Sequence, residues 1–169
     1  MSFSWLRLPA LLLGLLLATG TPGRAADAQE KATPPPDEEP RPKTLFERAG
    51  GTYALAAVAD DFVEALFADS VLGSRPAMKL ALRNGRKPGF KFQLASLLCQ
   101  ETGGPCKYDG RSMHEAHHDL RLSEREWTKA VSAFKRALER AKVPAVERQE
   151  IANLLGTLKG DIVNAPPAK

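Results

Sequence analysis

The amino-acid sequence predicts an all-α fold, and two observations carry that prediction. Apolar side chains recur every three or four residues along four segments of the chain, which is the periodicity of an amphipathic helix. No segment alternates polar and apolar residues over a useful length, so the sequence contains no strand signal. A chain of 169 residues with 43% hydrophobic content suits one folded domain with a core of its own.

The four expected helices are recognised by their apolar stripes and by the residues that precede them. Ser123 followed by Glu126 is the pattern of a capping box at the start of the third helix. Pro144 suits the first turn of the fourth helix, and the Gly50-Gly51 pair suits the turn before the first. The stripes are, in chain order, Leu55, Val58, Phe62 and Leu66; Phe90, Leu94, Leu97 and Leu98; Trp127, Val131, Phe134, Leu138 and Ala141; and Ile151, Leu154, Leu155, Leu158 and Ile162.

The first 28 residues are expected to be a secretory signal peptide. Arg7 precedes an apolar run from Leu8 to Ala18 that is too short to span a membrane. The sequence Ala26-Asp27-Ala28 fits a small-x-small cleavage site, and an uncleaved amino-terminal anchor is the alternative. After removal of the signal we expect no stable membrane span and an exported location, in the bacterial periplasm or an equivalent compartment.

Composition sets the remaining boundaries. Residues 29–43 are rich in proline and charge and are expected to form a disordered linker, because they have little apolar area to bury. The folded domain is expected over residues 44–163, with a disordered tail over 164–169. The 24 Lys and Arg and the 20 Asp and Glu are interspersed rather than gathered into a basic stripe, which argues against nucleic-acid binding.

All histidines of the chain lie on one short stretch that should be helical, and they are His114, His117 and His118. On a helix, His117 shares a face with Met113 and Leu120, so its imidazole points toward apolar surroundings. An imidazole so placed is either a metal ligand or a satisfied core histidine.

The other two histidines, His114 and His118, share the neighbouring and more polar face of the same helix. Their spacing is that of half a zinc site. Their acidic neighbours Glu115 and Asp119 look like ordinary solvated charges, so zinc is not expected here.

The segment from Leu98 to His117 carries a family resemblance. It combines the Gly103-Gly104-Pro105 turn, the Tyr-x-Gly at Tyr108 and a Met-x-x-Ala-His that ends at His117. It resembles the segment that joins the distal and proximal helices of group-one truncated haemoglobins, in which that last histidine is the proximal haem ligand. The patterns Leu45-Phe46-Glu47-Arg48-x-Gly50-Gly51 and Leu122-Ser123-x-x-Glu126-Trp127 extend the resemblance over the whole folded span.

The resemblance implies a truncated-globin, two-over-two helical sandwich that holds one non-covalent haem b (iron protoporphyrin IX), with His117 as the iron ligand. The chain agrees in lacking the Cys-x-x-Cys-His motif that attaches haem covalently. The implied partners are a diatomic gas, namely oxygen, nitric oxide or carbon monoxide, and an unidentified electron donor; oxygen transport is one such role. By similarity, the cofactor is lined by Met113, Leu122 and Trp127 on the proximal side and by Val63, Phe90, Leu94 and Leu98 on the distal side.

The chain departs from the family on the distal side. Val63 stands where the family usually has a tyrosine, and Phe90 and Leu94 stand where it often has a glutamine. Gln93 falls on a different face of the helix. Bound dioxygen carries partial negative charge, so the absence of a hydrogen-bond donor should speed its loss.

A second departure lies between Leu72 and Gly89, where the family places a phenylalanine against the haem. This chain has instead a longer basic stretch, from Lys79 to Lys87. Its side chains either meet the haem propionates or form an ordinary solvated loop, and the candidates are Arg83, Arg86, Lys87 and Lys91.

Cys99 and Cys106 are the only cysteines, and they flank the Gly-Gly-Pro turn. In an exported protein they are a candidate disulfide, which would stabilise the fold by roughly 2–3 kcal/mol at most. Two free, buried thiols are the alternative, because spacing alone does not fix the Cβ geometry.

Two further functions stay open beside gas binding. One is a haem enzyme on the same scaffold, with nitric oxide dioxygenase or peroxidase-like activity; peroxide cleavage needs a positioned acid–base group, which favours a gas-binding protein over an enzyme. The other is a helical interaction domain without haem, which the missing distal donor and the altered loop would explain.

Overall fold

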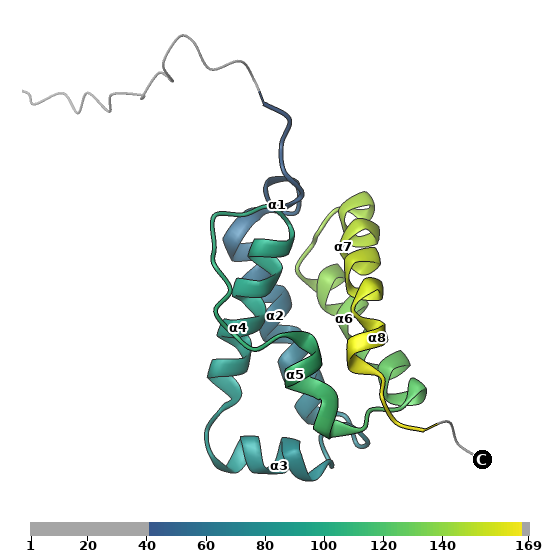
Figure 1. The fold of residues 1–169 in the computed structure, drawn as a ribbon. Helices are drawn as coiled ribbons and strands as arrows, with labels where there is room; N and C mark the ends of the chain where they lie inside the picture. Colours follow the sequence, from purple (N-terminus) through teal and green to yellow (C-terminus); the bar gives the residue numbers. More distant parts are fainter. Residues whose placement is uncertain (1–40, 167–169) are drawn as a thin grey trace, which may run out of the picture. The chain divides into compact units, whose positions relative to one another are not determined.

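The computed structural model describes residues 41–166, so the expected signal peptide and the linker up to residue 40 lie outside the described residues (Figure 1). Apart from one isolated parallel bridge, Leu122 to Val163, the regular structure of the described range is helical, which confirms the all-α class. The helices are α1 (Leu45–Arg48), α2 (Gly51–Ala68), α3 (Pro76–Arg83), α4 (Lys87–Glu101), α5 (Met113–His117), the 3-10 turn η1 (His118–Leu120), α6 (Glu124–Arg140), α7 (Ala145–Thr157) and α8 (Lys159–Ile162).

Three helices begin with a reciprocal capping box. Thr44 caps α1, Ser112 caps α5 and Ser123 caps α6, and a glutamate three positions later accepts from the backbone N–H of the cap residue. Each box satisfies two of the backbone N–H groups that a helix start leaves without partners. The capping box predicted at Ser123 and Glu126 is confirmed.

Two antiparallel helix pairs make up the two layers of the domain (Figure 1). α2 packs against α4 in one layer, α6 packs against α7 in the other, and α2 also contacts α6 across the layers. At this crossing Phe62 and Phe134 meet edge to face, with ring centroids 5.2 Å apart. The buried core consists of Ala49, Leu55, Val58, Leu98, Phe134, Ala137, Leu138, Val143 and Ile151.

The carboxyl-terminal helix differs from the sequence prediction. Pro144 is the N-cap and not part of the first turn, so α7 begins one residue later. The helix also breaks at Leu158, which ends α7 and precedes α8. The prediction that Leu154 points inward is wrong: it is 37% exposed, because the buried stripe runs through Ile151 and Leu155 and leaves Leu154 at its edge.

Two ordered segments go beyond the sequence expectations. The stretch expected to be a basic loop contains α3, which has Pro76 in its first turn and buries Ala81. Order also continues past residue 163, because the backbone N–H groups of Asn164 and Ala165 both donate to the Leu122 carbonyl at 3.1 Å. No helix of the range 41–166 is both long enough and apolar enough to cross a membrane.

Candidate functional site

The centre of the site is His117, the last residue of α5. The helix is five residues long, and the Ser112 capping box holds its start, with the Glu115 carboxylate 2.9 Å from the Ser112 backbone nitrogen. The His117 side chain is half-buried, whereas His114 and His118 are exposed. One imidazole of the three therefore faces the interior of the domain.

A hydrogen bond fixes the orientation of the His117 ring. Its Nδ1 lies 2.8 Å from the carbonyl oxygen of Met113, one turn earlier in α5. Because a carbonyl only accepts, Nδ1 carries the hydrogen and donates it, which leaves the lone pair on Nε2. Burial lowers the pKa of the imidazole more than the hydrogen bond to Met113 raises it. The net effect favours the neutral ring, the form that binds a metal ion.

The end of α5 is held by a residue that the sequence analysis assigned to the tail. The side-chain Nδ2 of Asn164 donates to the carbonyl of His118 at 2.7 Å and to that of His117 at 3.2 Å. Its Oδ1 accepts from the backbone N–H of Leu122 at 3.1 Å. These bonds satisfy carbonyls that a helix end leaves free, and they tie α5 to the segment after α8. No sequence signal marked Asn164, since its role depends on contacts with residues more than forty positions away.

The loop that leads to α5 is fixed to α4 by a disulfide between Cys99 and Cys106, with a Cα–Cα distance of 5.7 Å. Of the two alternatives for these cysteines, the structure therefore has the bonded one. A Cβ added at Gly104 would lie 2.7 Å from the Cys99 sulfur, so only glycine fits this turn. The Gln100 side chain also accepts from the Tyr108 backbone N–H at 2.9 Å, which makes a second tie between α4 and the loop.

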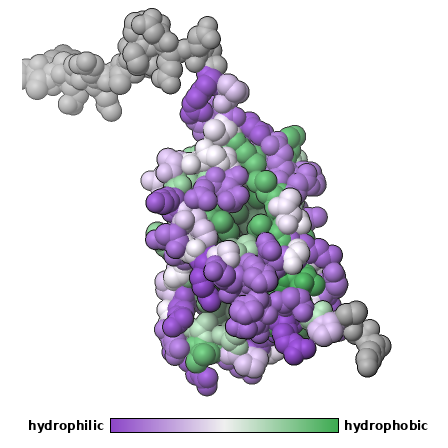
Figure 2. Space-filling model, in the orientation of Figure 1, coloured by the Kyte–Doolittle hydropathy of each residue, from purple (hydrophilic) through white to green (hydrophobic). Residues whose placement is uncertain are grey.

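The expected lining residues divide into two groups. Leu94, Met113, Leu122 and Trp127 are half-buried, and Phe90 is 42% exposed. Val63 and Leu98 are buried, and Leu98 belongs to the core. Figure 2 shows apolar surface in a hollow in the middle of the domain, between hydrophilic residues. Partly uncovered apolar side chains, together with an imidazole that has a free nitrogen, suit a flat apolar group with a metal at its centre.

No side chain at the three expected distal positions offers a hydrogen-bond donor, since Val63, Phe90 and Leu94 are all apolar. The nearby amide of Gln93 is turned to the loop, where its Nε2 donates to Asp109 at 3.2 Å. Its Oε1 is buried without a hydrogen-bond partner among the described residues. A carbonyl oxygen only accepts, so in this orientation Gln93 supplies no donor either.

Comparison with known proteins decides the family. The model of the bacterial-like globin family matches residues 44–164. The chain belongs to this globin family. It is 27% identical over 144 residues to a group 1 truncated haemoglobin of Chlamydomonas moewusii, a match that covers 82% of this chain and 79% of that protein.

Solved structures show the same fold as this globin. The truncated haemoglobin of Tetrahymena pyriformis, in its Fe(III) form, matches with a TM-score of 0.62 and 23% identity over 72% of this chain and 99% of that chain. The group II truncated haemoglobin of Bacillus anthracis matches with a TM-score of 0.62 and 20% identity over 77% of this chain and 98% of that chain. The two-over-two sandwich predicted for the globin domain is confirmed.

The four basic candidates for a propionate contact differ in the structure. Lys87 pairs with Glu64 at 2.8 Å, and Lys91 pairs with Asp60 at 2.6 Å and with Glu64 at 2.7 Å. These two ammonium groups of the globin are thus neutralised by carboxylates of α2. Arg83 and Arg86 are exposed near the end of α3.

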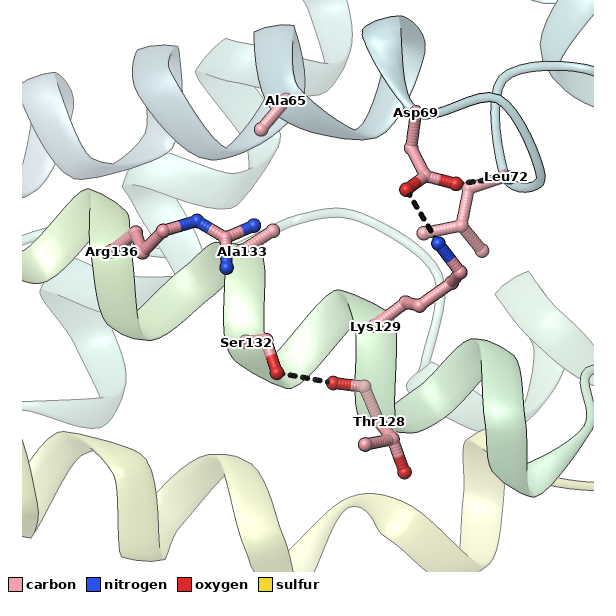
Figure 3. Close-up of a pocket in the computed structure, with 8 residues that line it drawn as sticks. All are labelled: Ala65, Asp69, Leu72, Thr128, Lys129, Ser132, Ala133 and Arg136. Atoms are coloured by element: carbon pink, nitrogen blue, oxygen red, sulfur yellow. Dashed lines mark hydrogen bonds and ion pairs between the residues drawn. The ribbon is translucent and has the colours of Figure 1, made fainter.

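A separate hollow of about 220 Å³ lies between α2 and α6 of the globin (Figure 3). Asp69 and Lys129 form an ion pair in it, with 3.0 Å between oxygen and nitrogen, and the Ser132 hydroxyl donates to the Thr128 carbonyl. None of the lining residues belongs to the expected haem site. The Asp69–Lys129 ion pair joins the end of α2 to α6, whereas the Ser132 hydrogen bond lies within α6.

Proposed function

We propose that this globin binds one haem b without a covalent link and that Nε2 of His117 would hold the iron. The observation that carries the proposal is the hydrogen bond from His117 Nδ1 to the Met113 carbonyl, which leaves Nε2 available on a half-buried ring. A hydrogen bond to the other ring nitrogen, as here, fixes the tautomer and the direction of a metal-binding histidine. The relatives of this globin are haemoglobins, one of them solved in its Fe(III) form, which supports haem binding here as well.

The lining residues hold the macrocycle by apolar contact. Met113, Leu122 and Trp127 would cover its proximal face, and Phe90 and Leu94 its distal face. These side chains are half-buried or exposed in the structure. A bound haem would cover them and remove their apolar surface from water, which is the main source of affinity in sites of this kind. Lys87 and Lys91 are paired with carboxylates of α2, so Arg83 and Arg86 are the candidates that would reach the propionates.

The haem would supply an iron centre that can take a diatomic gas. The residues expected on the distal side, Val63, Phe90 and Leu94, are apolar and offer no hydrogen-bond donor. Such a pocket suits apolar carbon monoxide and nitric oxide, and it holds oxygen weakly because oxygen gains charge on binding. The same side chains supply no acid–base group for cleaving peroxide. Gas binding is thus the function that the site supports best, with an electron donor keeping the iron reduced.

The globin is further proposed to work outside the cytoplasm, in the bacterial periplasm or an equivalent compartment. The signal-like sequence of residues 1–28 supports this location. The Cys99–Cys106 disulfide supports it independently, because disulfides persist in oxidising compartments.

Titration of the tag-free full chain with haem tests the proposal. Wild type should bind one equivalent and give a Soret band that shifts when carbon monoxide is added to the reduced protein. His117→Ala should lose the histidine-ligated spectrum in the ferrous state. His114→Ala and His118→Ala are matched controls on the same stretch and should keep it. An unchanged spectrum in His117→Ala would remove His117 as the ligand, and failure of wild type to bind one equivalent would overturn the proposal.

A further inference from the structure

The two other histidines lie on the exposed side of this segment, His114 in α5 and His118 at the start of the 3-10 turn η1. His114 and His118 are exposed, and their rings stack with centroids 5.8 Å apart and planes inclined by 21°. Helical backbone joins them: the His118 N–H bonds to the His114 carbonyl, and His118 itself has right-handed helical angles. The two imidazoles therefore lie about one turn apart on the same side of the segment, where α5 passes into η1.

The residues from His114 to His118 also match a metal-binding sequence motif. They read His-Glu-Ala-His-His, which is the His-Glu-x-x-His arrangement that places two zinc-binding imidazoles at i and i+4. In metalloproteases the glutamate of that pattern is a general base. Here Glu115 is engaged in the capping box, where its Oε2 lies 2.7 Å from the Ser112 hydroxyl. The pattern in this chain retains the two histidines without the catalytic carboxylate.

We propose that His114 and His118 together bind one divalent late transition-metal ion on the surface of α5, separate from the iron site at His117. The sequence argued against zinc at this pair, and the structure changes that expectation because the two rings lie side by side. Imidazole nitrogen is a preferred ligand of Cu²⁺, Ni²⁺ and Zn²⁺, and Cu²⁺ binds such sites most tightly. Within residues 41–166, no group of three or more His, Cys, Asp and Glu side chains is placed to hold a metal. The site therefore has two protein ligands, and water completes the coordination.

The ring geometry needs little change to bind an ion. Metal–nitrogen bonds of about 2.0–2.1 Å place two imidazoles on one ion with ring centres about 5 Å apart. The observed 5.8 Å is close to that value, and rotation about the soft Cβ–Cγ torsions brings the nitrogens together. Because both rings are already side by side on the helix, the second metal bond forms at high effective concentration.

A carboxylate next to His118 favours a cation at this position. Nε2 of His118 lies 2.9 Å from Oδ1 of Asp119, whose side chain is 86% exposed. A hydrogen bond to so exposed a carboxylate is weak and gives way to a metal ion, and the carboxylate then lies beside a bound cation. The ion would join His114 to His118 and so stabilise the last turn of α5, which ends in His117.

Copper binding by the tag-free full chain without haem tests the site. Wild type should bind one Cu²⁺ with an electron paramagnetic resonance spectrum that shows nitrogen ligands. His114→Ala and His118→Ala should each weaken that binding at least about tenfold, because each removes one arm of the chelate. Copper should also raise the melting temperature of wild type but not of the double variant.

Two further variants separate this ligand set from others. His117→Ala should keep the copper affinity, since its ring lies on another face and serves the proposed iron site. Asp119→Asn should change the affinity less than either histidine variant. Equal affinity in wild type and in the double His114→Ala, His118→Ala variant would overturn the proposal, as would loss of binding in His117→Ala alone. Because no haem is present, these outcomes are independent of whether the globin binds haem.

Discussion

Nδ1 of His117 donates to the carbonyl oxygen of Met113 across 2.8 Å, and this bond leaves Nε2 as the ring nitrogen with a free lone pair. The contact is internal to α5, so it moves with the helix. The position of the ring within the domain then depends on what holds α5 at its two ends. The Ser112 cap and the disulfide-bonded loop hold its start, and Asn164 holds its end.

Asn164→Ala removes the two side-chain hydrogen bonds to the carbonyls of His117 and His118. With the end of α5 released, the imidazole is less well directed, and haem should dissociate about tenfold faster, as for other losses of support behind a metal ligand. Transfer of haem to an excess of a scavenger protein measures that rate. Asn153→Ala is the matched control, because the Asn153 side chain bonds to Gln149 within α7. Equal rates in the two variants would show that Asn164 does not position His117.

Leu94→Gln adds a hydrogen-bond donor on the distal side, where the chain has none at the expected positions. One new hydrogen bond to bound oxygen is worth about 1 kcal/mol or more, so oxygen should dissociate roughly tenfold more slowly. Stopped-flow or flash measurements of oxygen release give the rate. Phe92→Gln makes a comparable change at a residue that is 67% exposed on the same helix, and it should leave the rate unchanged. Unaltered release in Leu94→Gln would mean that residue 94 does not face the ligand.

Reduction of the Cys99–Cys106 disulfide should lower the stability of the domain. The bond closes a short loop, with a sequence separation of 7, so chain-entropy reasoning gives about 2.5 kcal/mol. Urea unfolding of the oxidised and reduced full chain measures the difference. The Cys99→Ala, Cys106→Ala double variant should match the reduced protein and should not respond to reductant. Coincident unfolding midpoints for oxidised and reduced wild type would contradict this prediction.

Asp69 should make the stability of the domain depend on acid pH. Hydrogen bonds from the Leu72 backbone, from Lys129 and from the Val71 backbone hold the pKa of Asp69 at about 2, below its ordinary 3.8. The folded state thus favours the charged form, and the stabilisation is complete above about pH 4 and is lost as the pH falls toward 2. Asp69→Asn should be less stable than wild type at pH 6, by about 1 kcal/mol. That gap should narrow in urea titrations at pH 2–3, whereas a gap independent of pH would contradict the assignment.

Much of the fold could be predicted from the sequence because its signals are local. The helical stripe from Leu55 to Leu66 and the Ser123–Glu126 cap depend on residues within a turn or two of each other, and α2 and α6 form as expected. The short α3 was missed because its basic residues looked like a solvated loop. The position of Asn164 depends on a contact with α5 across the fold, which no local pattern reports.

The site was predicted unevenly for the same reason. His117 is predicted as the ligand from its place on an apolar helix face together with the Met-x-x-Ala-His motif, and its ligation of iron stays a prediction. The bonds that orient it, from Nδ1 to Met113 and from Asn164 to the helix end, appear only in three dimensions. The basic residues Lys87 and Lys91 were candidate propionate contacts, yet the structure pairs both with carboxylates of α2, since α2 and α4 lie side by side.

Chemical rescue tests most directly whether His117 ligates the iron. His117→Gly removes the imidazole and leaves space for a free one, so the reduced full chain with haem should lose its histidine-ligated spectrum and regain it when imidazole is added. His114→Gly and His118→Gly should have the wild-type spectrum with or without imidazole. If the His117→Gly protein has the wild-type spectrum before imidazole is added, then a residue other than His117 ligates the iron.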